Sequence, residues 1–520
     1  MLRLLDARFA GNAYAIEIDA ALPRILALAD RDPLSLTRGF GDRRFWAWKL
    51  ADFANGTLQG PVNGLSRLLE IGAFGPRVDP ERIRTLIGSM LEATPRLMRL
   101  DGSFEEALPY EQSYCVTALV LYDHLCAVER LAGPDDAWAR EQSAALAPAA
   151  AFLVRRDETH GFISNHLATA AAALLRWDRL HGDAAARAKA EELISRILDR
   201  KSPEGWFEEY GGADPGYQTL CMTHLADAAE ILESPPLWEA LDRGARFLCH
   251  FAHPDGSFGG IYGSRATRIY YPAAMELLAS RFAQAGALAC WMRPAIARQA
   301  PVTLSAIDTP NLPPVFNNYC QALAVAPGVD PSVPPSPAEP GRHYLPEAGL
   351  LADIGPTHHS VISTRKAVIC HWRDAHMVLN DTGLVLKSAS GKHLTSQGDP
   401  ATTAELTGER LVLRGGLTER SMPLPNPYNV LILRLLSVSV MRIPAIGALV
   451  KKLIAGLLVR SGGRAAGRFS RTIELGPALA VTDRWEPAHL ERVSVEEPFS
   501  VIHMASSGYW QRGDTEGPQR

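Results

Sequence analysis

The sequence predicts a multidomain α and β protein, in which an N-terminal α/α toroid, an incomplete ring of helical hairpins, precedes an antiparallel β-sandwich. Three observations predict this fold class. Apolar residues recur at helical spacing from about residue 13 to 300, as in 167–175 and 237–248. Residues 325–341 then contain six prolines, which excludes a helix. From about residue 360 short β-type runs follow, separated by turn residues at short intervals.

The change of character near residue 325 divides the chain into domains. We expect a toroid domain over 1–325, a proline-rich linker over 326–345, and a β-sandwich domain over 346–520. An apolar segment at about 428–460 is expected to be a helical insertion in the sandwich domain. A chain of 520 residues, of which 47% are hydrophobic and 21% charged, is long enough to bury more than one core.

A loose repeat in the helical part predicts how the hairpins are arranged. Gly102, Gly161, Gly205 and Gly256 each precede an aromatic residue by one or two positions, and they stand 59, 44 and 51 residues apart. That period is about the length of one helical hairpin with its loops, so it indicates a stacked or closed array. A toroid is preferred over an open helical solenoid. In a closed ring the equivalent loops meet on one face, where their polar residues form one cleft.

Composition excludes several function classes. A net charge of -4 and a pI of about 6.4 provide no basic field for nucleic acid. The seven cysteines form no CxxC pair and are expected to be reduced, and the first residues do not resemble a secretion signal, so a cytoplasmic location is expected. HExxH, Walker A and GxGxxG patterns are missing and the histidines are not spaced as ligands, which predicts neither a metal site nor a cofactor.

The loops between the helices supply the candidate site residues. Asn165 and His166 begin one apolar helix, and Tyr217 begins another 52 residues later; Asn165 also suits a purely structural helix N-cap. Aromatic rings cover the apolar faces of sugars, and cations meet carboxylates, although large rings also fill helix interfaces. The substrate-binding candidates chosen on these grounds are Arg44, Trp46, Trp48, Tyr110, Glu111, Glu209, Tyr210, Arg265, Arg268, Tyr271, His358 and His359.

Two short segments resemble a known family. GFISNHL at 161–167 and GWFEE at 205–209, followed by PGY at 215–217, are similar to segments of the heparinase II/III-type polysaccharide lyases. The resemblance implies an α/α toroid before an antiparallel β-sandwich, and β-elimination at a uronic acid as the activity. The family's His-x-His-Ala-Asp segment in the β-domain is not matched by the nearest candidates, at 358–360 and 371–374.

The resemblance also implies roles for single residues. Asn165 and His166 match the residues that neutralise the substrate carboxylate, and Tyr217 matches the tyrosine that removes the C5 proton or protonates the departing O4. A free tyrosine has a pKa of about 10, so such a base needs nearby cations, for which Arg265, Arg268 and His359 are candidates.

These observations lead to one function hypothesis and two alternatives. The first is cleavage of a uronic-acid-containing polysaccharide, linked to exopolysaccharide metabolism, with an acidic polysaccharide or oligosaccharide as partner. The second is a non-catalytic glycan-binding or assembly protein in polysaccharide synthesis. The third is a terpenoid-cyclase or prenyltransferase-like toroid, suggested by the DGSF turns at 101–104 and 255–258, although DxDD and DDxxD motifs are missing.

The apolar segment over 428–460 has two interpretations. It is either an amphipathic insertion that makes a peripheral membrane or protein contact, or a helical pair packed on the β-domain. Cations interrupt it at intervals, so no stretch approaches the roughly 20 apolar residues of a spanning helix.

Overall fold

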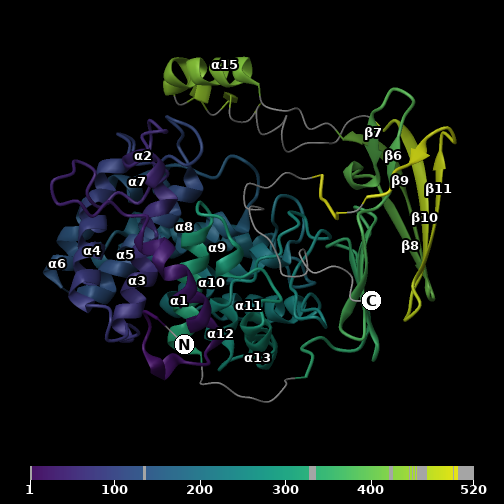
Figure 1. Ribbon diagram of the computed structural model, residues 1–520, viewed down its shortest axis with the longest axis horizontal. Helices are drawn as coiled ribbons and strands as arrows, with labels where there is room; N and C mark the ends of the chain where they lie inside the picture. The colour runs from purple at the N-terminus through teal and green to yellow at the C-terminus, as the bar shows by residue number, and fades with distance from the viewer. Residues whose placement is uncertain are drawn as a thin grey trace.

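The computed structural model describes residues 3–132, 136–326, 335–420, 426–443, 445–447, 449–450, 453, 465–495 and 497–501. Helices fill the chain as far as α14, which ends at Val325, and strands dominate from Gly341 onward. The helical part and the β part lie side by side (Figure 1). The predicted order, helices first and antiparallel strands second, is confirmed.

The helical part is an α/α toroid with an inner and an outer layer of helices. The inner helices are α3 (Pro61–Glu70), α5 (Tyr114–Ala132), α8 (Ser164–His181), α10 (Pro215–Leu232), α12 (Ala273–Leu278) and α14 (Leu312–Val325). The outer helices are α1 (Ala13–Leu26), α4 (Pro80–Ala93), α6 (Ala137–Ala144), α7 (Ala147–Arg155), α9 (Ala184–Asp199), α11 (Pro235–Cys249) and α13 (Ala283–Ala297). Each inner helix packs on the next, and α14 packs back on α3. The inner layer therefore forms a ring, and the predicted α/α toroid is confirmed.

Residue pattern explains the two layers. Helix α8 is buried on most sides and carries an alanine run at 170–173, whose small side chains let neighbouring helices approach closely. Helix α9 instead buries one stripe, Ala186, Ala190, Leu193 and Ile197, at three- to four-residue spacing, as an outer helix should.

The repeated glycines lie in tight turns where the outer helices approach. Gly102 has φ +95°, and a Cβ there would lie 1.9 Å from the carbonyl oxygen of Pro148. Gly205 has φ +97°, and a Cβ there would lie 2.4 Å from the carbonyl oxygen of Arg243. Both turns thus require a residue that adopts positive φ and has no side chain.

The β part consists of two antiparallel sheets. The first contains β1 (Gly341–Leu345), β2 (Leu350–Ile354), β3 (His358–Ser363), β4 (Val368–Arg373) and β5 (His376–Asp381) in sequential order. The second contains β6 (Val385–Lys387), β7 (His393–Thr395), β8 (Thr403–Thr407), β9 (Arg410–Arg420), β10 (Gly467–Glu474), β11 (Ala480–Glu486) and β12 (Glu491–Arg492). Its order is β11-β10-β9-β7-β6-β12, with β8 paired to β9. Strand β1 pairs with β2 along its whole length, so residues 341–345 belong to the sheet and not to a linker.

The central strands of the first sheet, β2, β3 and β4, are buried on both faces, because the sheet lies between the second sheet and the toroid. On β2, β3 and β4 the side chains of Leu351, Ile362 and Ile369 join the core between the two sheets. Their neighbours on the opposite face, which include Val361 and Trp372, join the core of the toroid. The alternation of side chains along a strand thus supplies two apolar faces, and the continuous burial of these strands follows from it.

The apolar insertion between β9 and β10 contains helix α15 (Pro427–Val438), and much of the range 444–464 lies outside the described residues. Helix α15 extends away from the sheets and lies above the toroid (Figure 1). Arg434 forms an ion pair with Asp52, and the Arg442 guanidinium lies 4.9 Å from the centre of the Tyr110 ring. The described helix therefore contacts the toroid, and of the two interpretations of this segment, packing on the β-domain does not describe α15. None of the described helices combines the length and hydropathy needed to span a bilayer.

Candidate functional site

Two loops of the toroid are joined where the inner helices α8 and α10 begin. Ile163 and Glu209 form an antiparallel bridge, and the Ser164 backbone N–H and hydroxyl both donate to the carbonyl oxygen of Glu208, at 3.0 and 2.8 Å. The backbone N–H of Tyr210 donates to the Phe162 carbonyl. These bridges fix the positions of the residues that begin α8 relative to those that precede α10.

Asn165 and Glu209 form a closed pair at this junction. The Asn165 backbone N–H donates to Glu209 Oε1 at 2.8 Å, and its side-chain Nδ2 donates to Oε2 at 2.9 Å. Both side chains are buried, Asn165 to 3% exposure. Burial raises the pKa of Glu209 to about 8, against the opposing influence of His166 and Asn165, so the carboxyl holds its proton at neutral pH.

His166 lies beside this pair and is held by a carboxylate. Its Nδ1 is 2.6 Å from Glu158 Oε2, and the other oxygen of Glu158 is 2.6 Å from Nδ1 of His160. Burial acts to raise the pKa of Glu158, but the hydrogen bonds from these two imidazoles outweigh it and lower that pKa well below 4.5. Glu158 is therefore a buried anion that fixes the orientation of His166.

The His166 ring carries positive charge at neutral pH. Burial acts to lower the pKa of the ring, but its contacts with Cys115, Tyr210 and Glu158 outweigh burial and raise that pKa well above 6.5. Cys115, the second residue of α5, shares a side-chain hydrogen bond with the imidazole. The ring is 14% exposed, so the cation is accessible from outside.

Tyr210 and Arg265 extend the group. The rings of His166 and Tyr210 meet edge-to-face with centroids 6.4 Å apart, and the Arg265 guanidinium lies 3.9 Å from the centre of the Tyr210 ring. Tyr210 has φ +54°, an uncommon backbone conformation for a tyrosine and one that is found at functional sites. Burial raises the pKa of its phenol even though both cations act to lower it, so the hydroxyl stays protonated at neutral pH.

Asp214 joins this group to Tyr217. It is the N-cap of α10, and its carboxylate accepts from the backbone N–H of Tyr217 at 3.1 Å and of Arg265 at 2.9 Å. Tyr217 is partly buried against the toroid core. One capping carboxylate thus positions the tyrosine and the arginine from two different hairpins.

A lysine of the β-domain reaches the same region. Lys366, in the turn between β3 and β4, donates from Nζ to the carbonyl oxygens of Ile261 and Gly263. Burial lowers its pKa to about 8, while Asp214 acts in the opposite direction. The β-domain therefore contributes to this junction through a lysine, where the family resemblance had directed attention to a histidine.

The structure brings Asn165, His166 and Tyr217 together with three substrate-binding candidates, Glu209, Tyr210 and Arg265. Arg268 and Tyr271 lie on the same hairpin as Arg265. The backbone N–H of Tyr271 donates to Thr219 Oγ1 of α10 at 3.1 Å. The charge of Arg268 acts to lower the pKa of the Cys370 thiol in β4, against the effect of burial.

The remaining substrate-binding candidates have other surroundings. Trp46, in α2 (Arg43–Trp46), donates from its indole to the Leu28 carbonyl at 2.8 Å, whereas Arg44 and Trp48 are exposed to solvent. The Tyr110 ring lies between Arg99 and Arg442, at 5.1 and 4.9 Å.

Glu111, which follows Tyr110, accepts from the backbone N–H groups of Ala107 and Leu108, so its carboxylate organises its own loop.

The two candidate histidines of the β-domain lie in the sheet facing the toroid. His359 is 2% exposed, and its Nε2 donates to the His250 carbonyl at 3.0 Å. His358 Nε2 is 3.2 Å from Asp353 Oδ2 within the same sheet. Both contacts connect structural elements, and neither places an imidazole against Asn165 or His166.

Three residues of the site were not among the sequence candidates. Glu158 is the carboxylate that holds His166, and Cys115 and Lys366 come from parts of the chain distant in sequence. These three depend on which elements the fold places side by side. Asp214, which holds Tyr217, is visible in the sequence as a polar residue of the third loop, and an Asp directly before a Pro-Gly helix start is a typical N-cap.

The DGSF turns have structural roles in the fold. Asp101 accepts from the backbone and hydroxyl of Ser103, and Asp255 accepts from Ser257 and from the Trp372 indole at 2.7 Å. Both aspartates therefore organise turns or domain contacts, which leaves the terpenoid-cyclase alternative without an acid or metal motif. In the part of the chain that the structure describes, no group of three or more His, Cys, Asp or Glu side chains is arranged to hold a metal ion.

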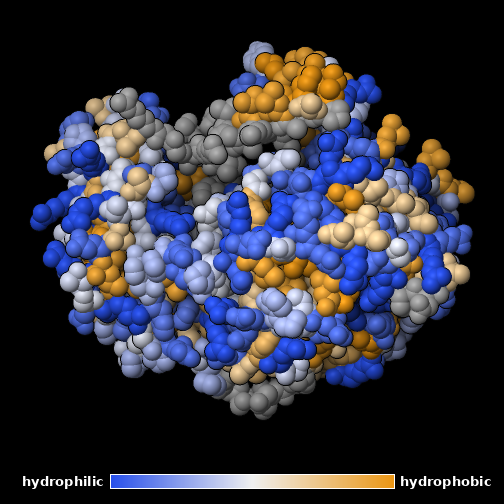
Figure 2. Space-filling model, turned by 180° about the vertical axis from the view of Figure 1, so that it is seen from behind, coloured by the Kyte–Doolittle hydropathy of each residue, from blue (hydrophilic) through white to orange (hydrophobic). Residues whose placement is uncertain are grey.

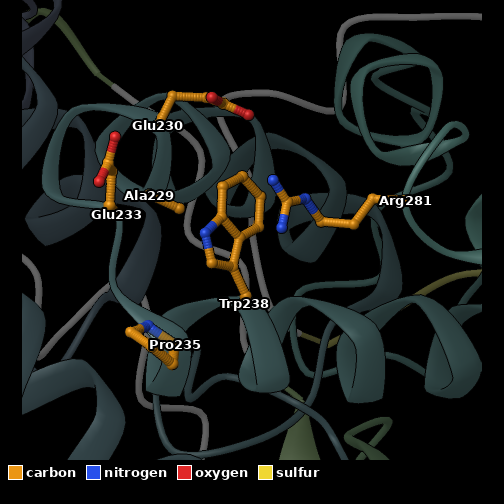
Figure 3. Close-up of a pocket in the computed structure, with 6 residues that line it drawn as sticks. All are labelled: Ala229, Glu230, Glu233, Pro235, Trp238 and Arg281. Atoms are coloured by element: carbon orange, nitrogen blue, oxygen red, sulfur yellow. The ribbon is translucent and has the colours of Figure 1, made fainter.

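A surface cavity of about 480 Å³ lies elsewhere, at the connection between α10 and α11 and at Arg281 (Figure 3). The Arg281 guanidinium lies 4.0 Å from the centre of the Trp238 ring, and the two side chains face each other beside Glu230 and Glu233. None of the residues described above for the junction of α8 and α10 lines it.

The fold and this site together define a toroid followed by a sandwich, with an Asn–His–Tyr group at the inner helix starts. Solved polysaccharide lyases are similar to it in fold. A Paenibacillus xanthan lyase has a TM-score of 0.49 at 12% identity, over 79% of this chain and 46% of that one. The chondroitin AC lyase of Streptomyces coelicolor A3, in complex with chondroitin sulphate, has a TM-score of 0.46 at 13% identity, over 78% of this chain and 66% of that one. Heparinase III has a TM-score of 0.45 at 10% identity, over 77% of this chain and 59% of that one.

The chain therefore spans about half to two-thirds of the length of these lyases. At such identities the likeness concerns the fold alone. No protein-family model matches the chain, and no curated protein matches it in sequence.

Proposed function

We propose that this chain is a carbohydrate-active protein that cleaves a uronic-acid-containing polysaccharide by β-elimination. The observation that carries the proposal is the group of two cations and two phenols at the starts of α8 and α10. His166 and Arg265 supply the cations on either side of the Tyr210 phenol, and Tyr217 begins α10 with its backbone N–H bound to Asp214, which also binds Arg265. An anionic sugar polymer needs cations for its carboxylates, and β-elimination needs groups that move protons.

The first requirement of the reaction is neutralisation of the substrate carboxylate. The C5 proton of a uronic acid is only weakly acidic until hydrogen bonds or cations take up the charge that develops on the carboxylate. His166, held by Glu158 at 2.6 Å and positively charged at neutral pH, is suited to this role. Glu209 holds its proton beside it, so it adds no negative charge that would repel the substrate.

The second requirement is proton transfer at two positions. One phenolate removes the proton from C5, the C4–O4 bond breaks as the C4–C5 double bond forms, and a phenol supplies the proton that O4 takes up. We assign removal of the C5 proton to Tyr217, whose backbone N–H is held by Asp214. Tyr210 suits protonation of O4, because its phenol stays protonated despite the cations on either side.

The proposed partner is an acidic polysaccharide or oligosaccharide, and the proposed setting is exopolysaccharide metabolism in the cytoplasm. Tyr217→Phe tests the assignment. In a screen that includes xanthan and chondroitin sulphate, wild-type protein should release an unsaturated uronate, followed by its ultraviolet absorbance. Tyr217→Phe should lower that rate by at least about a hundredfold, because it removes the proton-transfer group.

Tyr428→Phe is the matched control, since this tyrosine lies on α15 and is 77% exposed. It should retain the wild-type rate. Equal rates for Tyr217→Phe and wild type on a substrate that is cleaved would refute the role of Tyr217 and with it the proposed mechanism.

A non-catalytic glycan-binding protein is the second candidate, and one observation favours it. Asn165 is 3% exposed with its side-chain amide donating to Glu209, and His359 of the β-domain is turned onto the His250 carbonyl. A lyase needs such groups to face the substrate. Binding of acidic oligosaccharide that depends on His166, with no unsaturated product from any polymer in the screen, would establish this alternative.

A further inference from the structure

Helix α15 and the turn after it expose apolar side chains on nearly every side. Tyr428 is 77% exposed and Leu435 is 57% exposed. The residues of this helix are mostly apolar, as in a helix that is buried on all sides. The exposed apolar residues in this region, here called the apolar ridge, are Tyr428, Val430, Leu431, Ile432, Leu435, Val438, Val440 and Ile443. Figure 2 shows them as a raised hydrophobic cluster at the top of the molecule, where Figure 1 places α15. A contiguous exposed patch of this kind marks an interaction surface.

The segment that carries the ridge contains cations and no acids. Between residues 421 and 466 the sequence has no Asp or Glu, in a chain whose net charge is -4. The charged residues in that range are Arg434, Arg442, Lys451, Lys452, Arg460 and Arg464. The ridge is therefore combined with a charge pattern that attracts an anionic partner and repels a second copy of itself.

The ridge is also held in an outward position. Arg434 is paired with Asp52 of the toroid, and Arg442 lies over the Tyr110 ring at 4.9 Å. These two contacts tie the polar side of the segment to the protein. The apolar side chains consequently face solvent, although the chain could have buried them against the neighbouring toroid.

We propose that the apolar ridge docks on an anionic lipid bilayer. The helix has 12 residues, which is too short to span hydrocarbon and suits a helix lying in the headgroup region. Aliphatic side chains enter the acyl boundary, and the excess of cations in the sequence of this segment favours anionic over neutral lipid. This inference does not depend on the proposed catalysis, because none of its residues belongs to the Asn165–His166–Tyr217 group.

Vesicle flotation of the full-length protein tests the proposal. The wild type should float with phosphatidylcholine vesicles that contain about one-third phosphatidylglycerol, and should not float with phosphatidylcholine alone, since the cations of the segment are attracted only by anionic lipid. The double variant Leu431→Asp/Leu435→Asp should lower the bound fraction on anionic vesicles at least about tenfold. Both leucines are more than half exposed, so the protein should fold as before.

The matched control is Leu34→Asp/Leu100→Asp, which adds the same charge at two leucines that are 91% and 108% exposed elsewhere on the toroid. It should float like the wild type. A second variant, Lys451→Gln/Lys452→Gln, should weaken binding and reduce its dependence on salt, because it removes only charge.

Three outcomes would overturn the proposal. The wild type fails to float with anionic vesicles, or it floats equally well with neutral ones, or the ridge variant floats like the control. Light scattering tests the alternative that the ridge binds a second copy of this chain. That alternative would hold if the wild type is a dimer, if the ridge variant is a monomer, and if the wild type does not bind vesicles.

Discussion

Protonation of His359 should destabilise the folded protein, and His359→Gln should remove that sensitivity. His359 is 2% exposed at the contact between the first sheet and the toroid, where it donates to the His250 carbonyl. Burial and the nearby His253 lower its pKa to about 3, while Asp255 acts in the opposite direction. The adjacent His358 also acts to lower the pKa, and the hydrogen bond to the His250 carbonyl acts to raise it. Glutamine keeps a donor for the carbonyl and does not titrate.

The sign and size follow from linkage. The unfolded chain has a histidine pKa near 6.5 and the folded chain one of about 3, so below pH 6.5 the unfolded state takes up a proton that the folded state refuses. The stability that neutral His359 contributes is present above pH 6.5 and is lost as the pH falls toward 3. From about pH 7.5 to about pH 5.5 the loss is about 1.4 kcal/mol.

Urea unfolding at these two pH values measures this loss. The free energy of unfolding of His359→Gln, relative to wild type, should increase by about 1.4 kcal/mol on going to the lower pH. Taking the difference between the two proteins cancels the contributions of other groups, such as Glu209, whose raised pKa acts in the opposite direction. An unchanged difference at the two pH values would refute the reasoning, because it would mean that His359 takes up its proton equally in both states.

Two further predictions concern buried charge and thiol reactivity. Arg471 is fully buried between Asp381 and Asp483, so Arg471→Met leaves Asp381 without its cation and Asp483 with only the half-exposed Arg492. It should lower the free energy of unfolding by about 3–5 kcal/mol, measured with urea. Cys115 shares a hydrogen bond with His166, which acts to lower the thiol pKa against the effect of burial. Iodoacetamide should therefore alkylate Cys115 at least about threefold more slowly in His166→Ala, as followed by mass spectrometry.

Each of these two predictions has a control within the chain. Arg410→Met breaks the exposed pair of Arg410 with Glu474 and should cost less than about 1 kcal/mol. An equal cost for Arg410→Met and Arg471→Met would contradict the argument from burial. Cys290 is exposed, so its alkylation rate should not change in His166→Ala. A parallel change at both cysteines would point to a general loosening of the fold.

The architecture could be predicted from the sequence because local residue patterns determine its helices and turns. The apolar period of the helices and the spacing of glycines such as Gly102 and Gly205 follow from the hairpin geometry that those residues permit. Strand β1 was missed for the same reason. Residues 341–345 follow a proline-rich stretch, and no local pattern in the sequence shows that they pair with β2.

The candidate site was predicted in part. Asn165, His166 and Tyr217 stand at helix starts, where a short motif is visible in the sequence. The residues that set their charge are distant in the sequence, and the fold brings them to the site. Lys366 lies about 150 residues beyond Tyr217, and it reaches the junction because the first sheet packs against the toroid. Alternation along β3 likewise cannot show that the face bearing His359 is covered by a second domain.

The insertion that bears α15 begins and ends in the second sheet, yet its cations contact the toroid at Asp52 and Tyr110. It therefore acts as a brace between the two halves of the molecule, fixed at one end by the continuous chain and at the other by charge. The toroid and the second sheet are thus connected by a contact that does not pass through the first sheet.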